Sequence, residues 1–254
     1  VNALPGVAKP DPILLADEVR RNFGGVTAVD VQHLEVQRGS ITALIGPNGA
    51  GKTTLFNCIT GMYRPTSGQV SLRGEDITAA PAHRIARHGI ARTFQNLALF
   101  GGLSVLDNLM TGAYLQGRSG LLQGAFLTPA ARAERRAAEA AARETLAFLG
   151  MEELADAAPA ELSYGKQKQV EFARALMQNA RLVLLDEPMA GMSKTEKAAM
   201  SGLIQRVRRE RGITFLIVEH DIPVVMDLSD HIVVLDFGRK IADGLPEAVR
   251  QDPA

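Results

Sequence analysis

The sequence of 254 residues has a single cysteine, no excess of either charge and no long apolar run. With only Cys58 present, an intramolecular disulfide is excluded and a reducing compartment such as the cytosol is favoured. Lysine plus arginine and aspartate plus glutamate each number 28, and this balance argues against a dedicated nucleic-acid-binding protein. Because no uncharged apolar run reaches about 18 residues, no membrane-spanning helix is predicted.

The composition is that of an ordinary globular protein, with 46% hydrophobic and 22% charged residues. The length fits one large domain, or one domain with a subdomain. Residues 1–12 are rich in proline and lack the basic and apolar regions of a signal peptide. We therefore expect a loose leader over residues 1–12 and one domain over residues 13–254.

The core is predicted to be an α/β fold. Two β-rich segments, Ile13–Phe23 and Val26–Val36, flank a glycine pair and should form antiparallel strands. Further strands are expected at residues 40–45, 69–73, 182–185, 213–218 and 231–235, and helices at residues 51–60, 82–88, 166–177 and 194–211. Such alternation favours a mainly parallel sheet that is covered by helices.

Residues 105–165 are expected to form a helical subdomain that is inserted into this core. Beta-branched residues become rare there and alanine dominates. The segment Ala130–Phe148 has strong helix propensity, with Thr128 suited to cap the helix and Pro129 suited to its first position.

A phosphate-binding loop is predicted directly after the strand at residues 40–45, where the sequence matches the spacing G-x-x-x-x-G-K-[ST]. Such a loop aims backbone amides at polyphosphate, so glycines must remove steric obstacles, and the next helix adds its positive N-terminal end. Lys52 should reach the β- and γ-phosphates, Thr53 should hold Mg²⁺, and Thr54 is placed to touch the α-phosphate. The predicted phosphate-binding residues are Gly46, Pro47, Asn48, Gly49, Ala50, Gly51, Lys52, Thr53 and Thr54.

Two carboxylates follow the apolar strand at residues 182–185. Asp186 and Glu187 should lie at the carboxyl edge of the sheet, where open α/β sheets bind ligands. Asp186 is placed to bind Mg²⁺ through water, and Glu187 can orient or deprotonate the attacking water. These motifs leave GTPases, kinases and motor ATPases open, although the guanine-reading motif Asn-Lys-x-Asp is absent.

A third motif narrows the choice among these nucleotidase families. Leu162–Gln167 reads L-S-Y-G-K-Q and resembles the L-S-G-G-Q signature of ATP-binding-cassette (ABC) ATPases. Tyr164 and Lys166 depart from that pattern, whereas Ser163 and Gly165 keep its hydroxyl and backbone donors. The similarity covers nearly the whole chain, so the resemblance implies the cassette fold, with an antiparallel β subdomain and an inserted helical subdomain.

The resemblance also implies ATP and Mg²⁺ as ligands and gives roles to single residues. Phe23 lies where the family keeps an aromatic that stacks on adenine, Gln95 at the Q-loop position and His220 at the switch-histidine position. Ser193 stands where many members have aspartate or asparagine in the D-loop. The implied catalytic residues are Glu187, His220 and Gln95, the implied metal ligands are Thr53, Gln95 and Asp186, and Ser163, Tyr164 and Gly165 would cover the ATP of a partner cassette.

Within the family, the segments Arg92–Asn96, Val218–Asp221 and Val233–Ala242 resemble the ATPases of bacterial branched-chain amino-acid importers. This resemblance implies a cassette dimer, two transmembrane permeases, an indirectly acting periplasmic binding protein and a place on the cytoplasmic face of the inner membrane. The apolar segment Leu97–Phe100 could dock a permease helix or belong to the subdomain core.

Three alternatives stay open at this stage. The first is the ATPase of lipopolysaccharide export, which belongs to the same family. The second is a non-transport cassette that acts on DNA or ribosomes, although this chain has neither a long coiled-coil insertion nor a second cassette. The third is a nucleotide switch without turnover, against which the presence of Glu187 and His220 argues.

Overall fold

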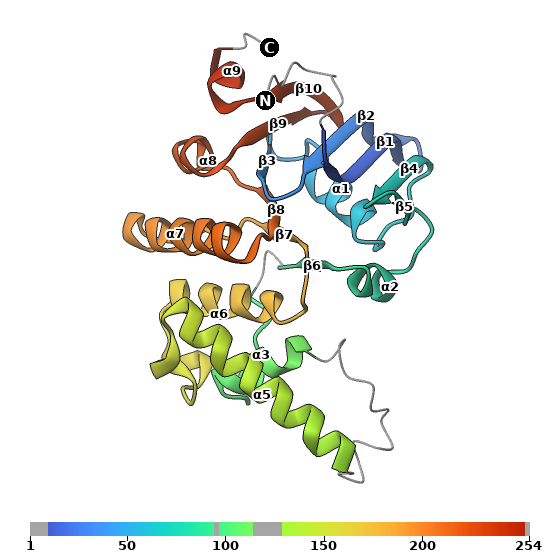
Figure 1. Ribbon diagram of the computed structural model, residues 1–254. Helices are drawn as coiled ribbons and strands as arrows, with labels where there is room; N and C mark the ends of the chain where they lie inside the picture. The colour runs from blue at the N-terminus through green and yellow to red at the C-terminus, as the bar shows by residue number, and fades with distance from the viewer. Residues whose placement is uncertain (1–9, 94–96, 114–128, 252–254) are drawn as a thin grey trace. The chain divides into compact units, whose positions relative to one another are not determined.

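The computed structural model describes residues 10–93, 97–113 and 129–251 (Figure 1). The chain divides into two compact units. The first combines Val1–Arg92 with Arg181–Ala254, and the second is Thr93–Ala180. The second unit is therefore an insertion in the first, and it contains the segment 105–165.

A six-stranded sheet forms the centre of the first unit. Its strand order is β10-β9-β3-β8-β7-β6, and every neighbouring pair is parallel except β10 with β9. The strands are β3 (Ile41–Ile45), β6 (Ile90–Arg92), β7 (Leu182–Asp186), β8 (Thr214–Val218), β9 (His231–Asp236) and β10 (Arg239–Gly244). The predicted mainly parallel sheet is confirmed, and the carboxyl ends of β3, β8 and β7 share one edge.

Both faces of this sheet are buried, which explains why its strands are continuous apolar runs. Leu44 of β3 packs into a core with helix α1 (Lys52–Ile59), whereas Ala43 and Ile45 pack on the opposite face with Val225 of α8 (Ile222–Leu228). The remaining helices of the unit are α2 (Ala82–Arg87), α7 (Lys194–Arg211) and α9 (Pro246–Gln251).

An antiparallel sheet of four strands, in the order β2-β1-β4-β5, completes the first unit. Its strands are β1 (Pro12–Phe23), β2 (Val26–Gln37), β4 (Ser67–Leu72) and β5 (Glu75–Asp76). The predicted antiparallel pairing of β1 with β2 is confirmed. Apolar residues of β1 and β2 share one core with α1 and with one face of the six-stranded sheet.

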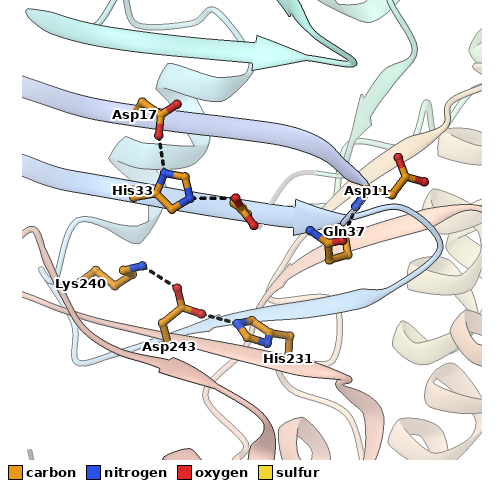
Figure 2. A network of polar contacts seen from close by, with 8 residues as sticks. Asp11, Asp17, His33, Gln37, His231, Lys240 and Asp243 are labelled. Carbon is orange, nitrogen blue, oxygen red and sulfur yellow. Dashed lines mark hydrogen bonds and ion pairs between the residues drawn. The ribbon is translucent and has the colours of Figure 1, made fainter. Parts of the chain in front are cut away.

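Polar side chains add contacts within strands and between neighbouring strands (Figure 2). His33 of β2 contacts Asp17 of β1 through Nδ1 and Glu35 through Nε2, the latter at 3.0 Å. On β10, Asp243 contacts His231 of β9 and accepts from Lys240 Nζ at 2.5 Å. None of these residues belongs to the predicted site, so we regard both groups as links within the sheets.

The second unit is helical. It comprises α3 (Val105–Gly112), α5 (Pro129–Leu149), the 3-10 turns η2 (Glu152–Leu154) and η3 (Pro159–Glu161), and α6 (Tyr164–Leu176). Helix α3 contacts both α5 and α6. The predicted cap Thr128 of α5 lies outside the described residues. No helix within the described ranges is both long and apolar enough to span a bilayer.

Candidate nucleotide site

The phosphate loop joins β3 to α1, and its glycines adopt backbone angles that other residues avoid. Gly46, Gly49 and Gly51 have φ values of 147°, 84° and 97°. A Cβ on Gly46 would lie 2.0 Å from the carbonyl oxygen of Leu235, and one on Gly51 would lie 2.4 Å from that of Ala28. Glycine is therefore required at Gly46 and Gly51 for two reasons. The backbone has a positive φ there, and a Cβ would clash with a neighbouring carbonyl oxygen.

The turn between β9 and β10 also contacts the loop through its backbone. The amide of Gly238, in the turn between β9 and β10, donates to the Ala50 carbonyl at 3.0 Å. The Gly238 carbonyl in turn accepts from the amide of Asp30 in β2 at 2.7 Å. Backbone hydrogen bonds thus link the loop to this turn and, through Gly238, to β2.

Lys52, the first residue of α1, folds back over the loop. Its Nζ donates to the carbonyl oxygens of Gly46 at 2.7 Å and Pro47 at 2.8 Å. Burial lowers the pKa of Lys52, while the charges of Glu187 and Asp186 act in the opposite direction. The loop residues therefore gather around a partly desolvated cation, as a polyphosphate site requires.

The start of α1 also supplies hydrogen-bond donors. Within the described part of the chain, the amides of Gly49, Gly51 and Thr53 form no hydrogen bond, and neither does the Thr53 hydroxyl. Free amides at a helix N-terminus attract anions because they combine donors with the positive end of the helix dipole. Thr54 lies in the same first turn of α1.

Asp186 ends β7 and is held by a residue without a predicted role. Arg92, the last residue of β6, donates from Nη2 to Asp186 Oδ2 at 2.8 Å and from Nη1 to Asn57 Oδ1 of α1 at 2.6 Å. The side chains of Arg92 and Asp186 are 9% and 4% exposed. Arg92 thereby ties the predicted metal-binding acid to the helix that follows the phosphate loop.

Glu187 and His220 meet although they are far apart in the sequence. His220 Nε2 lies 2.8 Å from Glu187 Oε1. Glu187 has a φ of 49°, an uncommon left-handed conformation for a glutamate, and its amide donates to the Val218 carbonyl at 2.9 Å. Because β7 and β8 are parallel neighbours, the residues that follow them come together at the carboxyl edge of the sheet.

Glu219 is a second residue without a predicted role. Its side chain is buried and accepts hydrogen bonds from the amides of Met189 and His220, at 2.8 Å and 3.1 Å. Burial raises the pKa of Glu219, while these amides oppose that shift. The available signal in the sequence was its place directly after the apolar strand β8.

Phe23 ends β1 and is 41% exposed. Its ring contacts Tyr63 edge to face, with centroids 5.3 Å apart, and the Arg21 guanidinium lies 4.6 Å from the Phe23 centroid. The residue predicted to stack on adenine is therefore accessible and belongs to a small aromatic and cationic cluster in the first unit. Tyr63 and Arg21 were not predicted.

The signature residues lie in the second unit. Ser163 caps α6 by accepting from the Lys166 amide at 3.3 Å, Tyr164 is 43% exposed and Gly165 is buried. Gln95 lies outside the described residues. Ser193, the departure in the D-loop, caps α7 in a reciprocal arrangement with Glu196, whose carboxylate accepts from the Ser193 amide at 2.9 Å.

The chain is similar in sequence and fold to known proteins of one family. The sequence profile described as ABC transporter matches residues 29–190. The chain is 42% identical, over 95% of both chains, to the high-affinity branched-chain amino acid transport ATP-binding protein BraF of Pseudomonas aeruginosa. It is 39% identical, with the same coverage, to LivG of Escherichia coli strain K12, which carries the same description. Among solved structures, the ADP conformation of MJ1267, an ATP-binding cassette of an ABC transporter, has a TM-score of 0.83 at 33% identity and covers 96% of both chains.

Proposed function

The chain belongs to the ABC transporter family, and on that premise we propose that it binds and hydrolyses ATP as a subunit of a bacterial branched-chain amino-acid importer. The observation that supports this most is the assembly at one sheet edge of the phosphate loop, Asp186 and the pair of Glu187 and His220. The importer assignment rests on the similarity to BraF and LivG, whose names state that transport function.

ATP binding would use the phosphate loop. Lys52 would exchange its contacts to the loop carbonyls for the β- and γ-phosphates, and the free amides of the loop would donate to phosphate oxygens. The donor set also suits Mg²⁺, a cation that prefers oxygen ligands, because the Thr53 hydroxyl and the Asp186 carboxylate are both oxygen donors. Bound there with Gln95, Mg²⁺ would neutralise charge that develops on the phosphates.

Hydrolysis would use Glu187 as the general base. A water oxygen attacks the γ-phosphorus, the bond from that phosphorus to the bridging oxygen of ADP breaks, and the water proton passes to the Glu187 carboxylate. His220 holds the carboxylate through the contact at 2.8 Å. The products are ADP and inorganic phosphate.

One cassette would supply only part of the active site. Ser163, Tyr164 and Gly165 would cover the γ-phosphate of a second cassette, so that two ATP molecules lie between two subunits. ATP would then stabilise the closed pair and hydrolysis would release it.

A permease helix would dock near the start of the second unit. Phe100 is 54% exposed. Arg174 fixes the segment beside it by donating from Nη1 to the Ala98 carbonyl at 2.6 Å, with its guanidinium 6.0 Å from the Phe100 ring centroid. An aromatic that stays exposed on a braced loop suits a contact with a partner helix. Two permeases and, through them, a periplasmic binding protein complete the proposed importer, which places the chain at the cytoplasmic face of the membrane.

The alternatives receive less support. BraF and LivG are named for branched-chain amino-acid transport, not for lipopolysaccharide export or for work on DNA or ribosomes. The contact between Glu187 and His220 also supports turnover over a binding switch.

The proposal is tested by measuring phosphate release from ATP by the purified chain. Lys52→Ala should reduce ATP binding and turnover by about 10- to 100-fold, because a charge-assisted contact is worth about 1.5–3 kcal/mol. Lys194→Ala, which removes an exposed lysine of α7, is the matched control and should behave as wild type. Hydrolysis by Lys52→Ala near the wild-type rate would refute the assignment of the phosphate loop.

A further inference from the structure

Glu219 is a buried carboxylate whose charge is held by backbone amides. It lies directly after β8 and is 4% exposed. Oε1 accepts from the Met189 amide at 2.8 Å, Oε2 accepts from the His220 amide at 3.1 Å, and the Asp221 amide is a further donor. No lysine or arginine side chain in the described part of the chain forms an ion pair with it.

Burying such a group is costly, so its partners indicate what it stabilises. A carboxylate that leaves water loses several kcal/mol of hydration unless hydrogen bonds replace it. An apolar side chain could fill the space after β8 without that cost. The amides that compensate Glu219 belong to two different loops, one after β7 and one after β8.

Those two loops carry the catalytic pair. Met189 lies two residues after Glu187 on the first loop, and His220 lies on the second. These contacts form a closed ring. Glu187 contacts His220 at 2.8 Å, the His220 amide donates to Glu219, and Glu219 accepts a further hydrogen bond from the Met189 amide on the loop that carries Glu187. A second hydrogen bond joins the two segments, because the Glu187 amide donates to the Val218 carbonyl at 2.9 Å.

We propose that Glu219 is a positioning residue that holds His220 against Glu187 by joining the loop after β7 to the loop after β8. This inference rests on the proposed function, since it requires Glu187 to act as the base. Glu219 touches neither water nor phosphate in this scheme. It fixes the backbone of His220, and His220 fixes the carboxylate that accepts the proton.

Glu219→Gln tests the proposal because glutamine keeps the shape of the side chain but turns an NH₂ group toward amides that donate to the carboxylate in wild type. The turnover number should fall by about 10- to 100-fold, because a small displacement of a catalytic group such as Glu187 has a large effect on rate. The affinity for ATP should stay within about twofold, because Lys52 and the loop are unchanged. Glu247→Gln, on the exposed face of α9, is the matched control and should keep wild-type values.

A double-mutant cycle separates positioning from general structural damage. In a His220→Ala background, Glu219→Gln should have almost no further effect on turnover, since the group that it positions is gone. Full additivity, an unchanged turnover number, or a loss of ATP affinity as large as the loss of turnover would each overturn the proposal. If wild type itself releases no phosphate, the proposed function fails instead, and the two failures are thereby distinguished.

A second variant covers the case in which Glu219→Gln does not fold. Glu219→Asp keeps the buried charge and adds no donor, but it is one methylene too short to reach both loops. It should show the same fall in turnover with unchanged ATP affinity. Wild-type turnover in Glu219→Asp would contradict the proposed role.

Discussion

At the scale of single residues, Phe23, the residue proposed to stack on adenine, is an exposed aromatic whose ring is held by its neighbours. Phe23 contacts Tyr63 edge to face and has the Arg21 guanidinium 4.6 Å from its ring centroid. Arg21 is itself fixed, because its Nη1 donates to the Arg64 carbonyl at 2.9 Å. Edge-to-face and cation–π contacts are each worth about 0.5–1.5 kcal/mol, enough to fix the ring orientation.

Replacing Phe23 tests whether this ring binds the base. Phe23→Ala should weaken ATP binding several-fold, because stacking of a base on an aromatic contributes about 1–3 kcal/mol. Phe23→Trp keeps a stacking surface and should retain most of the affinity. Titration with a fluorescent ATP analogue measures both variants, and circular dichroism checks that the fold is intact. Unchanged affinity in Phe23→Ala would remove Phe23 from the site.

Glu219 gives a prediction about pH at the same scale. Burial raises its pKa in the folded chain above the value for an unfolded glutamate. The folded state therefore binds the proton more tightly, and the associated stability is present below the unfolded pKa and is lost as pH rises through the folded one. As pH rises from about 4, the free energy of unfolding of wild type should fall relative to that of Glu219→Gln. Urea denaturation at several pH values measures it, and a difference that is independent of pH would contradict the shift.

The phosphate-loop motif could be identified in the sequence because its spacing is local, and the structure describes its residues between β3 and the first turn of α1. Their role in binding phosphate stays a prediction. The contacts of Arg92 and Glu219 could not be predicted, because their partners are distant in the chain. Arg92 contacts Asn57 and Asp186, and Glu219 accepts from Met189. A single sequence contains no record of such tertiary contacts.

At the scale of elements, the close packing of two helices requires a glycine at one position. Gly112 ends α3 where α3 packs on α6, and a Cβ there would lie 2.3 Å from the Arg174 carbonyl oxygen. Gly202 in α7 is a useful contrast, because a Cβ there would meet nothing within 4 Å. The two glycines thus share a helical setting but differ in the space around them.

The same substitution should therefore have opposite effects at these two positions. Gly112→Ala should destabilise the chain by about 1–3 kcal/mol, because backbone must move to admit the methyl group. Gly202→Ala should stabilise it by about 0.4–1 kcal/mol, because alanine loses less chain entropy on folding. Chemical denaturation of the two variants beside wild type provides the measurement. A stable Gly112→Ala variant would show that α3 and α6 are not packed as closely as described.

Long elements were predicted better than short ones. Helix α7 was expected at residues 194–211 and is found there, with its capping box and a C-terminal glycine in the left-handed conformation. The short helices α8 and α9 and the strands β6 and β10 were not predicted. Each has few residues, so hydrophobic periodicity is weak and sheet pairing or a cap decides its structure. Asp221, for example, caps α8 and pairs with Lys197 at 2.5 Å.

At the scale of the whole molecule, the predicted ATP contacts are divided between the two units. The first unit holds the phosphate loop, Asp186, Glu187 and His220, and the second holds Ser163, Tyr164 and Gly165. In the proposed mechanism the second set serves a partner cassette rather than its own. Assembly should therefore depend on ATP, and this dependence can be measured without a transport assay.

Glu187→Gln should trap the assembled state. Glutamine keeps the shape of the side chain but cannot take a proton from water, and loss of such a group typically costs about 10²–10⁴-fold in rate. Lys52, Thr53 and Asp186 remain, so ATP should still bind. Unhydrolysed ATP should hold two cassettes together, and the variant should shift from monomer to dimer when saturating ATP is added, as measured by light scattering.

Adding Ser163→Arg to Glu187→Gln should abolish that dimer. Ser163 is exposed at the N-terminus of α6, where a bulky side chain would separate the helix from the partner's phosphate. Ser67→Arg, which places the same side chain on the exposed start of β4, is the matched control and should leave ATP-dependent dimerisation intact. The variants are measured alone and together with a second cassette of the importer. Both settings are needed because each ATP is covered by one signature, which either a second copy of this chain or the other cassette can supply. A dimer that forms without ATP, or that survives Ser163→Arg in both settings, would contradict the sandwich mechanism and leave the ATP site complete within one chain.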